Sequence, residues 1–318
     1  WFVAQCGVPE EPSKLGNIAV AMVAEQLGAA GFPACRYLDT LLGVELLRRC
    51  RPSGALGALL RDTVEGRHGV AVAYRDAGND RAPDRLPQWP RTPGGDSSLL
   101  LSARRSFVVS ADEADTLLLL GAGRPGVALL PTSSPSLLLE GRSTMGQRRL
   151  FDIDLSHARI SGSDLLEFGF DGDPAVVWTG VLARARVWQA AYLTGLASGA
   201  LDLAVQYARS RRQFGKPLAR FQSISFRLAA GSARVHATRL LVRDVALSAD
   251  AGADVAVPAA RALALASEVS RAVTAESVHI HGAFGMTLQS AAQRFLRDVG
   301  VESVWLGVVP ELRAANKG

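Results

Sequence analysis

Long helical periodicity in the C-terminal half is the feature that most constrains this fold. Apolar residues recur at helical spacing over 175–210, 219–250 and 255–279. The breaks fall at 215–217 (Gly-Lys-Pro) and at 251–252 (Ala-Gly). Glycine and proline end helices, so three long helices with short turns between them are expected. Such a pattern predicts an antiparallel helix bundle.

The rest of the chain shows two sequence patterns, one helical and one of short apolar runs. Residues 15–64 also show helical spacing, with breaks at 31–33 (Gly-Phe-Pro) and 52–54 (Pro-Ser-Gly). Between 67 and 172 lie short apolar runs separated by Gly, Pro, Asp and Ser, namely 70–73, 99–101, 107–109, 116–120, 127–130 and 137–139. Runs of this length predict a small β-domain with strands of about five residues. We therefore expect a mainly α protein with a central β-domain: an N-terminal helical domain at 1–66, a middle β-domain at 67–172 and a C-terminal helical bundle at 173–318.

Composition limits the function classes. The 318 residues are 48% hydrophobic, which suits two or three domains, and no apolar run is long enough to predict a membrane span. No signal peptide is expected at the start, and Cys6, Cys35 and Cys50 lack metal-ligand spacing, so buried thiols in a reducing cytoplasm are expected. The net charge of +5 comes mostly from arginine. Because no basic stretch is interleaved with aromatics, we expect no nucleic-acid binding, whereas attraction to a phosphate-bearing cofactor is compatible with this charge.

Two short motifs have simpler explanations than ligand binding. Residues 121–126 match GxGxxG after an apolar run, but Pro125 interrupts the segment and a second apolar run follows at 127–131. A dinucleotide site needs a helix to begin there, so a hairpin turn is predicted instead. His279 and His281 stand two residues apart, which points them in different directions on a helix. No metal site is predicted.

Two C-terminal segments carry most of the information about function. The first is residues 207–218 (YARSRRQFGKPL), followed by Phe221-Gln222, and alone it is a helix end with arginines suited to the helix dipole. The second is residues 279–286 (HIHGAFGM), followed by an Arg297-Asp298 helix. Together they resemble the acyl-CoA dehydrogenase family, and residues 8–11, 60–73 and 105–120 resemble that family's earlier segments.

The resemblance implies an FAD site that is shared across a subunit interface. Arg211 is expected to reach the pyrophosphate, since a guanidinium fork suits a pair of phosphate oxygens. Phe214 would line the adenine end, and Gln222 would lie nearby. The turn at Gly282 would let the backbone approach the nucleotide closely. His279 stands where the family has glutamine, and Ala283 replaces the family's second glycine of this turn.

The same resemblance shows no catalytic base. The family removes a proton with a glutamate in one of two places, and these positions correspond to Ala185 and Leu306. No Asp or Glu occurs between Asp173 and Asp202. We therefore assign no catalytic residue to this chain.

The expected contacts to the flavin ring also differ from the family. The family's Trp-x-Thr, which stacks on and hydrogen-bonds the isoalloxazine, aligns with Phe107-Val108-Val109. The Thr/Ser-Glu-Pro near the substrate aligns with 75–77 (Arg-Asp-Ala). This division of features resembles the non-catalytic subunit of the heterotetrameric (α2β2) acyl-CoA dehydrogenases of bacterial steroid side-chain degradation. It implies FAD shared with a catalytic paralogue, an acyl-CoA at the partner's site, and an electron-transfer flavoprotein or similar acceptor.

Two other hypotheses remain at this point. One is a self-sufficient dehydrogenase with a displaced base, because Glu302 lies one helical turn before Leu306 and Glu311 lies shortly after it. The other is a flavin-free scaffold or binding protein of the same fold. Cofactor content distinguishes these hypotheses from the first.

Overall fold

A computed structural model describes residues 16–76, 83–89, 98–169 and 172–314. Its contacts group the chain into two compact units. The strand unit comprises 35–144 and 149–182, and the bundle unit comprises 15–34, 145–148 and 183–318, within the described residues. Each unit is described by itself. The three-domain division expected from the sequence stays a prediction. The two compact units each combine separate segments of the chain, so they do not test boundaries drawn along the sequence.

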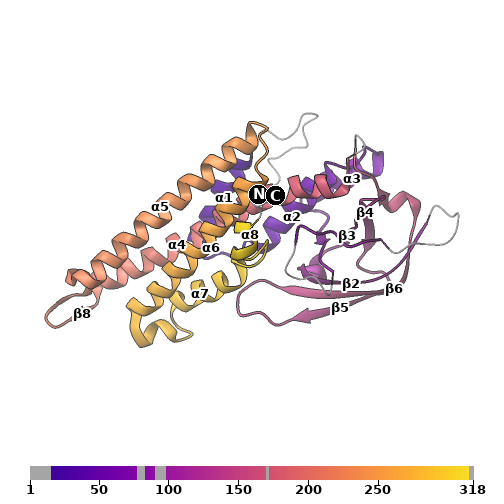
Figure 1. The fold of residues 1–318 in the computed structure, drawn as a ribbon. Coiled ribbons are helices and arrows are strands. Elements are labelled where there is room, and N and C mark those ends of the chain that lie inside the picture. The colour runs from indigo at the N-terminus through magenta and orange to yellow at the C-terminus, as the bar shows by residue number, and fades with distance from the viewer. Residues whose placement is uncertain (1–15, 77–82, 90–97, 170–171, 315–318) are drawn as a thin grey trace. The chain divides into compact units, whose positions relative to one another are not determined.

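The described residues of the strand unit form helices and two sheets (Figure 1). Helices α2 (Cys35–Leu47) and α3 (Gly54–Val64) lie wholly within this unit, and α4 (Pro174–Ser210) begins in it. One sheet has the order β1-β3-β4-β7, with β1 (Val70–Ala73) and β3 (Thr116–Leu120) parallel, and with β4 (Val127–Pro131) and β7 (Leu165–Leu166) antiparallel to their neighbours. The other is an antiparallel sheet of order β2-β6-β5, formed by β2 (Leu99–Val109), β6 (Leu150–Ile160) and β5 (Leu137–Arg142).

The core of this unit is apolar and continuous between the two sheets. Strands β1 and β3 are buried at every position, which explains why their sequences are unbroken apolar runs. Side chains from both sheets share one cluster, among them Leu101, Leu117, Leu119, Ile153 and Leu155. Strands β1 and β3 were predicted to the residue.

Two expectations about strands need correction. The runs 99–101 and 107–109 belong to one long strand, β2, whose register shifts between Arg105 and Val108. Strand β6, the middle strand of its sheet, was not predicted at all. The GxGxxG segment is a hairpin turn between β3 and β4, as expected, and the amide of Gly121 donates to the carbonyl of Gly126 at 3.2 Å.

The bundle unit is helical. Its helices are α1 (Asn17–Ala29), α4 (Pro174–Ser210, in this unit from Ala183), α5 (Gln222–Asp250), α6 (Ala256–His281), α7 (Ala291–Glu302) and α8 (Val309–Ala314). Helices α1 and α4 cross closely, since a Cβ built on Gly195 would lie 2.0 Å from the carbonyl oxygen of Glu25. A short hairpin, β8 (Arg212–Gln213) with β9 (Lys216–Pro217), connects α4 to α5. The three predicted long helices and the predicted mainly α class with a central β-domain are thus confirmed.

Candidate functional site

The predicted cofactor residues all lie at one end of the bundle unit. Their positions are the residue after α4 (Arg211), the tip of the β8–β9 hairpin (Phe214), the start of α5 (Gln222), the last turn of α6 (His279) and the residue after it (Gly282). An apolar cluster draws these three helix ends together, with Ala208 from α4, Leu228 from α5 and Ile280 from α6. Figure 1 shows the hairpin labelled β8 at the tip of this end. The structure therefore places together residues that are 71 positions apart in the sequence (282 − 211).

The hairpin keeps its functional side chains outside the core. Backbone hydrogen bonds fix its ends: the Arg211 amide donates to the Tyr207 carbonyl at 2.8 Å, and the Leu218 amide donates to the Arg211 carbonyl at 2.9 Å. Phe214 adopts a left-handed φ of 50° and is 92% exposed. Arg211 is also exposed. An exposed arginine and an exposed aromatic ring on a fixed turn can contact a phosphate and a planar base.

The end of α6 presents an open turn. Gly282 has φ 62°, and a Cβ built there would meet no atom within 4 Å. His279 is exposed, whereas His281 is buried and stacks on Tyr207 with ring centroids 4.4 Å apart. The Nδ1 atom of His281 lies 2.7 Å from the Ser277 carbonyl oxygen. His281 thus holds the α6 end against α4, a role that residue spacing alone did not reveal. Within the described residues, no group of three His, Cys, Asp or Glu could hold a metal ion.

Both base positions are apolar and buried. Ala185 is 5% exposed and Leu306 is 3% exposed. The Leu306 carbonyl accepts a hydrogen bond from Nε of buried Arg186 at 3.1 Å. Neither position offers a group that can accept a proton from carbon.

Glu302 is committed to buried polar contacts. Its Oε1 accepts from Nε of Arg148 at 3.0 Å, and its Oε2 accepts from Nε2 of Gln189 at 2.7 Å. The side chains of Arg148 and Glu302 are 1% and 5% exposed. The Arg148 guanidinium also lies 4.2 Å from the ring centroid of Trp305. Glu311 differs, since it is exposed in the first turn of α8.

Asp298, one turn before Glu302 on α7, is also bound. Its Oδ1 accepts from the Gln147 amide at 2.9 Å, and its Oδ2 accepts from the Gln147 side chain at 2.7 Å. Burial raises the pKa of this carboxyl, although the bonds from Gln147 oppose the shift. The acids of α7 therefore serve the packing of residues 145–148 against the bundle.

Two of the three positions expected to meet the flavin ring are buried in the core of the strand unit, and the third, Phe107, is half-buried. Val109 is 1% exposed and Val108 is fully buried, so both are core residues. Phe107 has φ 59° and its ring lies 4.7 Å from the Arg142 guanidinium. Arg75 is 6% exposed, and Ala77 lies outside the described residues.

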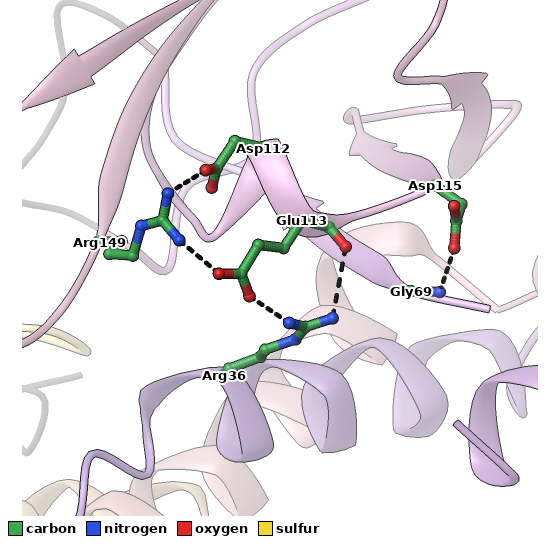
Figure 2. Close-up of polar contacts among 6 residues, drawn as sticks. All are labelled: Arg36, Gly69, Asp112, Glu113, Asp115 and Arg149. Atoms are coloured by element: carbon green, nitrogen blue, oxygen red, sulfur yellow. Dashed lines mark hydrogen bonds and ion pairs between the residues drawn. The ribbon is translucent and has the colours of Figure 1, made fainter. Parts of the chain in front are cut away.

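Ion pairs hold the turn that follows these positions. Figure 2 shows Glu113, in a 3-10 turn (Ala111–Glu113), between Arg36 of α2 and Arg149, with Asp112 also paired to Arg149. Beyond this turn, Asp115 accepts from the Gly69 amide at 2.7 Å. The carboxylates that follow the expected ring contacts are thus ion-paired or hydrogen-bonded inside the strand unit.

The two cysteines that the structure describes fit the expectation of buried thiols. Cys35 and Cys50 are free and buried. Burial raises the pKa of the Cys50 thiol to about 12. Cys6 and residues 8–11 lie outside the described residues.

Comparison with known proteins agrees with this fold. Residues 174–309 match the family model described as acyl-CoA dehydrogenase, C-terminal domain. This match places the C-terminal helices, from α4 to the start of α8, in the likeness of the acyl-CoA dehydrogenase family. A 3-(aryl)acrylate reductase of Clostridium sporogenes is 26% identical over 94% of this chain and 82% of its own length. The structure of butyryl-CoA dehydrogenase from Megasphaera elsdenii has the same fold, with a TM-score of 0.84, 24% identity and coverage of 95% of this chain and 80% of that one.

A third likeness is to a solved structure whose name joins two components. A variant of the Tcur3481-Tcur3483 steroid acyl-CoA dehydrogenase superposes with a TM-score of 0.81 at 25% identity, over 95% of this chain and 80% of that chain. Other curated relatives match over less of their length, 58% and 42% in two cases. Homologues in this family bind FAD. Among the described residues, no helix is both long and apolar enough to cross a bilayer.

Proposed function

We propose that this chain is the non-catalytic subunit of a heteromeric, FAD-dependent acyl-CoA dehydrogenase. In this proposal it completes the nucleotide end of a partner's FAD site with Arg211, Phe214, Gln222, His279 and Gly282. The partner, a catalytic paralogue, supplies the general base and binds the acyl-CoA. The likeness to a steroid acyl-CoA dehydrogenase whose name joins two components supports both the heteromer and a steroid side-chain thioester as substrate.

The observation that carries this proposal is the state of the two base positions. Ala185 and Leu306 are buried and apolar, and Glu302 has both oxygens hydrogen-bonded. Removal of a proton beside a thioester needs a positioned group of suitable pKa. The Glu302 carboxylate is instead held by hydrogen bonds from buried Arg148 and from Gln189, so it is positioned for packing and not for attack on a substrate proton.

This chain offers groups that suit the nucleotide portion of FAD but none that suits the flavin ring. At the bundle end, the exposed Arg211 offers charge-assisted hydrogen bonds to a phosphate, and the open Gly282 turn leaves room for backbone approach. In the strand unit, Val109 offers neither exposure nor a polar atom to the ring. FAD, when bound, supplies the hydride acceptor for α,β-desaturation. This chain's residues then bind and orient its nucleotide portion.

The proposal also includes an electron acceptor for the reduced flavin and a cellular location for the complex. Reduced flavin must pass its electrons on, and an electron-transfer flavoprotein or similar acceptor is the partner we infer for that step. Relatives include a subunit of a caffeyl-CoA reductase-Etf complex, 36% identical over 38% of this chain. We also propose a cytoplasmic location, which the free, buried Cys35 and Cys50 support.

Base assignment in the assembled complex tests the proposal. Glu302→Gln and Glu311→Gln should leave turnover per bound FAD near wild type, and loss of the partner's own base should lower it by about 10²–10⁴-fold or more. Assembly and FAD content are measured beside turnover, so that a folding defect is not mistaken for a catalytic one. A drop of that size in either variant, with assembly and FAD intact, would show that this chain carries a displaced base and is an enzyme in its own right.

A further inference from the structure

A ring contact joins the two parts of the predicted nucleotide site. Tyr207 lies in the last turn of α4, shortly before Arg211, and His281 is the last residue of α6, directly before Gly282. The two rings stack with their centroids 4.4 Å apart and an interplanar angle of 27°. His281 is buried and Tyr207 is half-buried. The stack therefore connects the two helix ends from which the exposed Arg211 and the open Gly282 turn project.

Tyr207 also fixes the β8–β9 hairpin through its backbone. Its carbonyl accepts from the Arg211 amide at 2.8 Å and from the Ser210 hydroxyl at 3.2 Å. The Leu218 amide in turn donates to the Arg211 carbonyl at 2.9 Å, which closes the other end of the hairpin. The Tyr207 ring packs on the apolar cluster that contains Ile280 of α6. A shift of this ring would thus move the backbone that carries Arg211.

His281 fixes the opposite part, the turn after α6. Its Nδ1 atom lies 2.7 Å from the Ser277 carbonyl oxygen, so the ring is held across the last turn of its own helix. The Ser277 hydroxyl donates to the carbonyl of Ala200 on α4 at 2.8 Å. In the turn itself, a Cβ built on Gly285 would lie 2.8 Å from the Cβ of His281. The turn therefore packs directly against the residue that stacks on Tyr207.

A ligand that contacts both helix ends needs both of them in place at once. When only a fraction of the molecules has a binding site in its competent arrangement, the apparent affinity falls by that fraction. Arg211 and the Gly282 turn leave different helices, so their spacing depends on the contacts between those helices. The Tyr207–His281 stack is the contact that lies next to both.

We propose that Tyr207 and His281 are positioning residues for the nucleotide site. Their stack sets the spacing between the Arg211 hairpin and the Gly282 turn, so that both meet the same FAD. This rests on the proposed function and deepens it, because it names two residues that act on FAD through Arg211 and Gly282. The stack needs an aromatic ring at position 207, so phenylalanine should serve there and leucine should not.

A double-mutant cycle in the assembled complex tests this role. The chain is co-purified with a catalytic paralogue, and the Kd of FAD is measured by titrating the flavin-depleted complex. Tyr207→Leu should weaken FAD binding about tenfold, and Tyr207→Phe should stay within about twofold of wild type. In the Arg211→Ala background, Tyr207→Leu should cost less than about threefold, because the residue through which Tyr207 acts is gone. A general loss of stability would instead give the same loss in both backgrounds.

Variants of His281 separate the stack from the hydrogen bond. His281→Phe keeps a ring and removes the bond to the Ser277 carbonyl, whereas His281→Asn keeps an N–H group near that carbonyl and removes the ring. FAD binding should weaken about tenfold in the asparagine variant and stay close to wild type in the phenylalanine variant. His236→Asn is the matched control, since His236 is exposed on α5, and it should change nothing. The melting temperature of each variant chain shows that it has folded.

The outcomes distinguish this inference from the proposed function. If Arg211→Ala weakens FAD binding but Tyr207→Leu does not, or if their losses simply add, the stack only packs the bundle and the nucleotide site stands. Equal losses for Tyr207→Phe and Tyr207→Leu would also overturn the positioning role. If Arg211→Ala leaves FAD affinity unchanged, the proposed nucleotide site is wrong and this inference falls with it.

Discussion

The end of the helix bundle and the region around its base positions lie in the same compact unit, yet their polar side chains serve different purposes. At the end, Arg211 is exposed on a turn held by backbone hydrogen bonds, and His279 is exposed in the last turn of α6. Around the base positions, Arg148 and Glu302 are buried and bound to each other. The exposed groups remain able to bind a ligand, whereas the buried groups hold the fold. A subunit that supports a partner's cofactor needs the first region and can use the second for packing.

The largest expected effect comes from breaking the buried pair. Glu302→Ala leaves Arg148 buried without its carboxylate, and loss of one partner of a buried ion pair typically costs about 3–5 kcal/mol. We expect the free energy of unfolding, measured by chemical denaturation, to fall by that amount. Glu311→Ala is the control, since this residue is exposed, and it should stay within about 0.5 kcal/mol of wild type. An equal, small effect for both would mean that Glu302 is not held as described.

Next in size is the effect of Arg211→Ala on cofactor binding. A charge-assisted hydrogen bond contributes about 1.5–3 kcal/mol, so FAD affinity of the assembled complex should fall about 10- to 150-fold. The melting temperature of this chain alone should not change, because Arg211 is exposed. Arg209→Ala, two residues earlier on α4 and also exposed, controls for lost positive charge. Equal FAD affinity in the two variants would mean that Arg211 is only a solvent-exposed residue at a helix end and does not contact FAD.

The smallest effect concerns Asp152 in the strand unit. Burial opposes its ionisation, but hydrogen bonds from Arg142 hold the pKa of this carboxyl below its usual value. A depressed pKa adds stability above the unfolded-state value, near pH 4, and this stability is lost as the pH falls through the folded-state value. Asp152→Asn should therefore flatten the loss of stability below about pH 4, as followed by melting temperature against pH. Asp202→Asn, which is exposed on α4, should leave the curve unchanged.

The accuracy of the sequence predictions depended on where the stabilising contacts lie. Strands β1 and β3 were predicted because a buried strand is a continuous apolar run in the sequence itself. Strand β6 was missed because Asp152 and Asp154 interrupt its apolar residues. These acids are paired with Arg142 and Arg104 on neighbouring strands, and such pairing is invisible in a local window.

The residues of the candidate site also differ in how far the sequence could predict them. The lengths of α4, α5 and α6, together with the family resemblance, were enough to place Arg211, Gln222 and Gly282 at related helix ends. The state of Glu302 was not predictable, because its partner Arg148 is 154 residues away in the sequence.

FAD stoichiometry tests the central claim most directly. The chain is purified alone and with a catalytic paralogue, and flavin is counted by absorbance against each chain's concentration. Our account predicts little FAD in the chain alone and about one FAD per pair of unlike chains in the complex, because Phe107, Val108 and Val109 do not form a ring site while the Arg211 end remains exposed. A homo-oligomer of this chain, yellow and fully loaded with one FAD per chain, would contradict it.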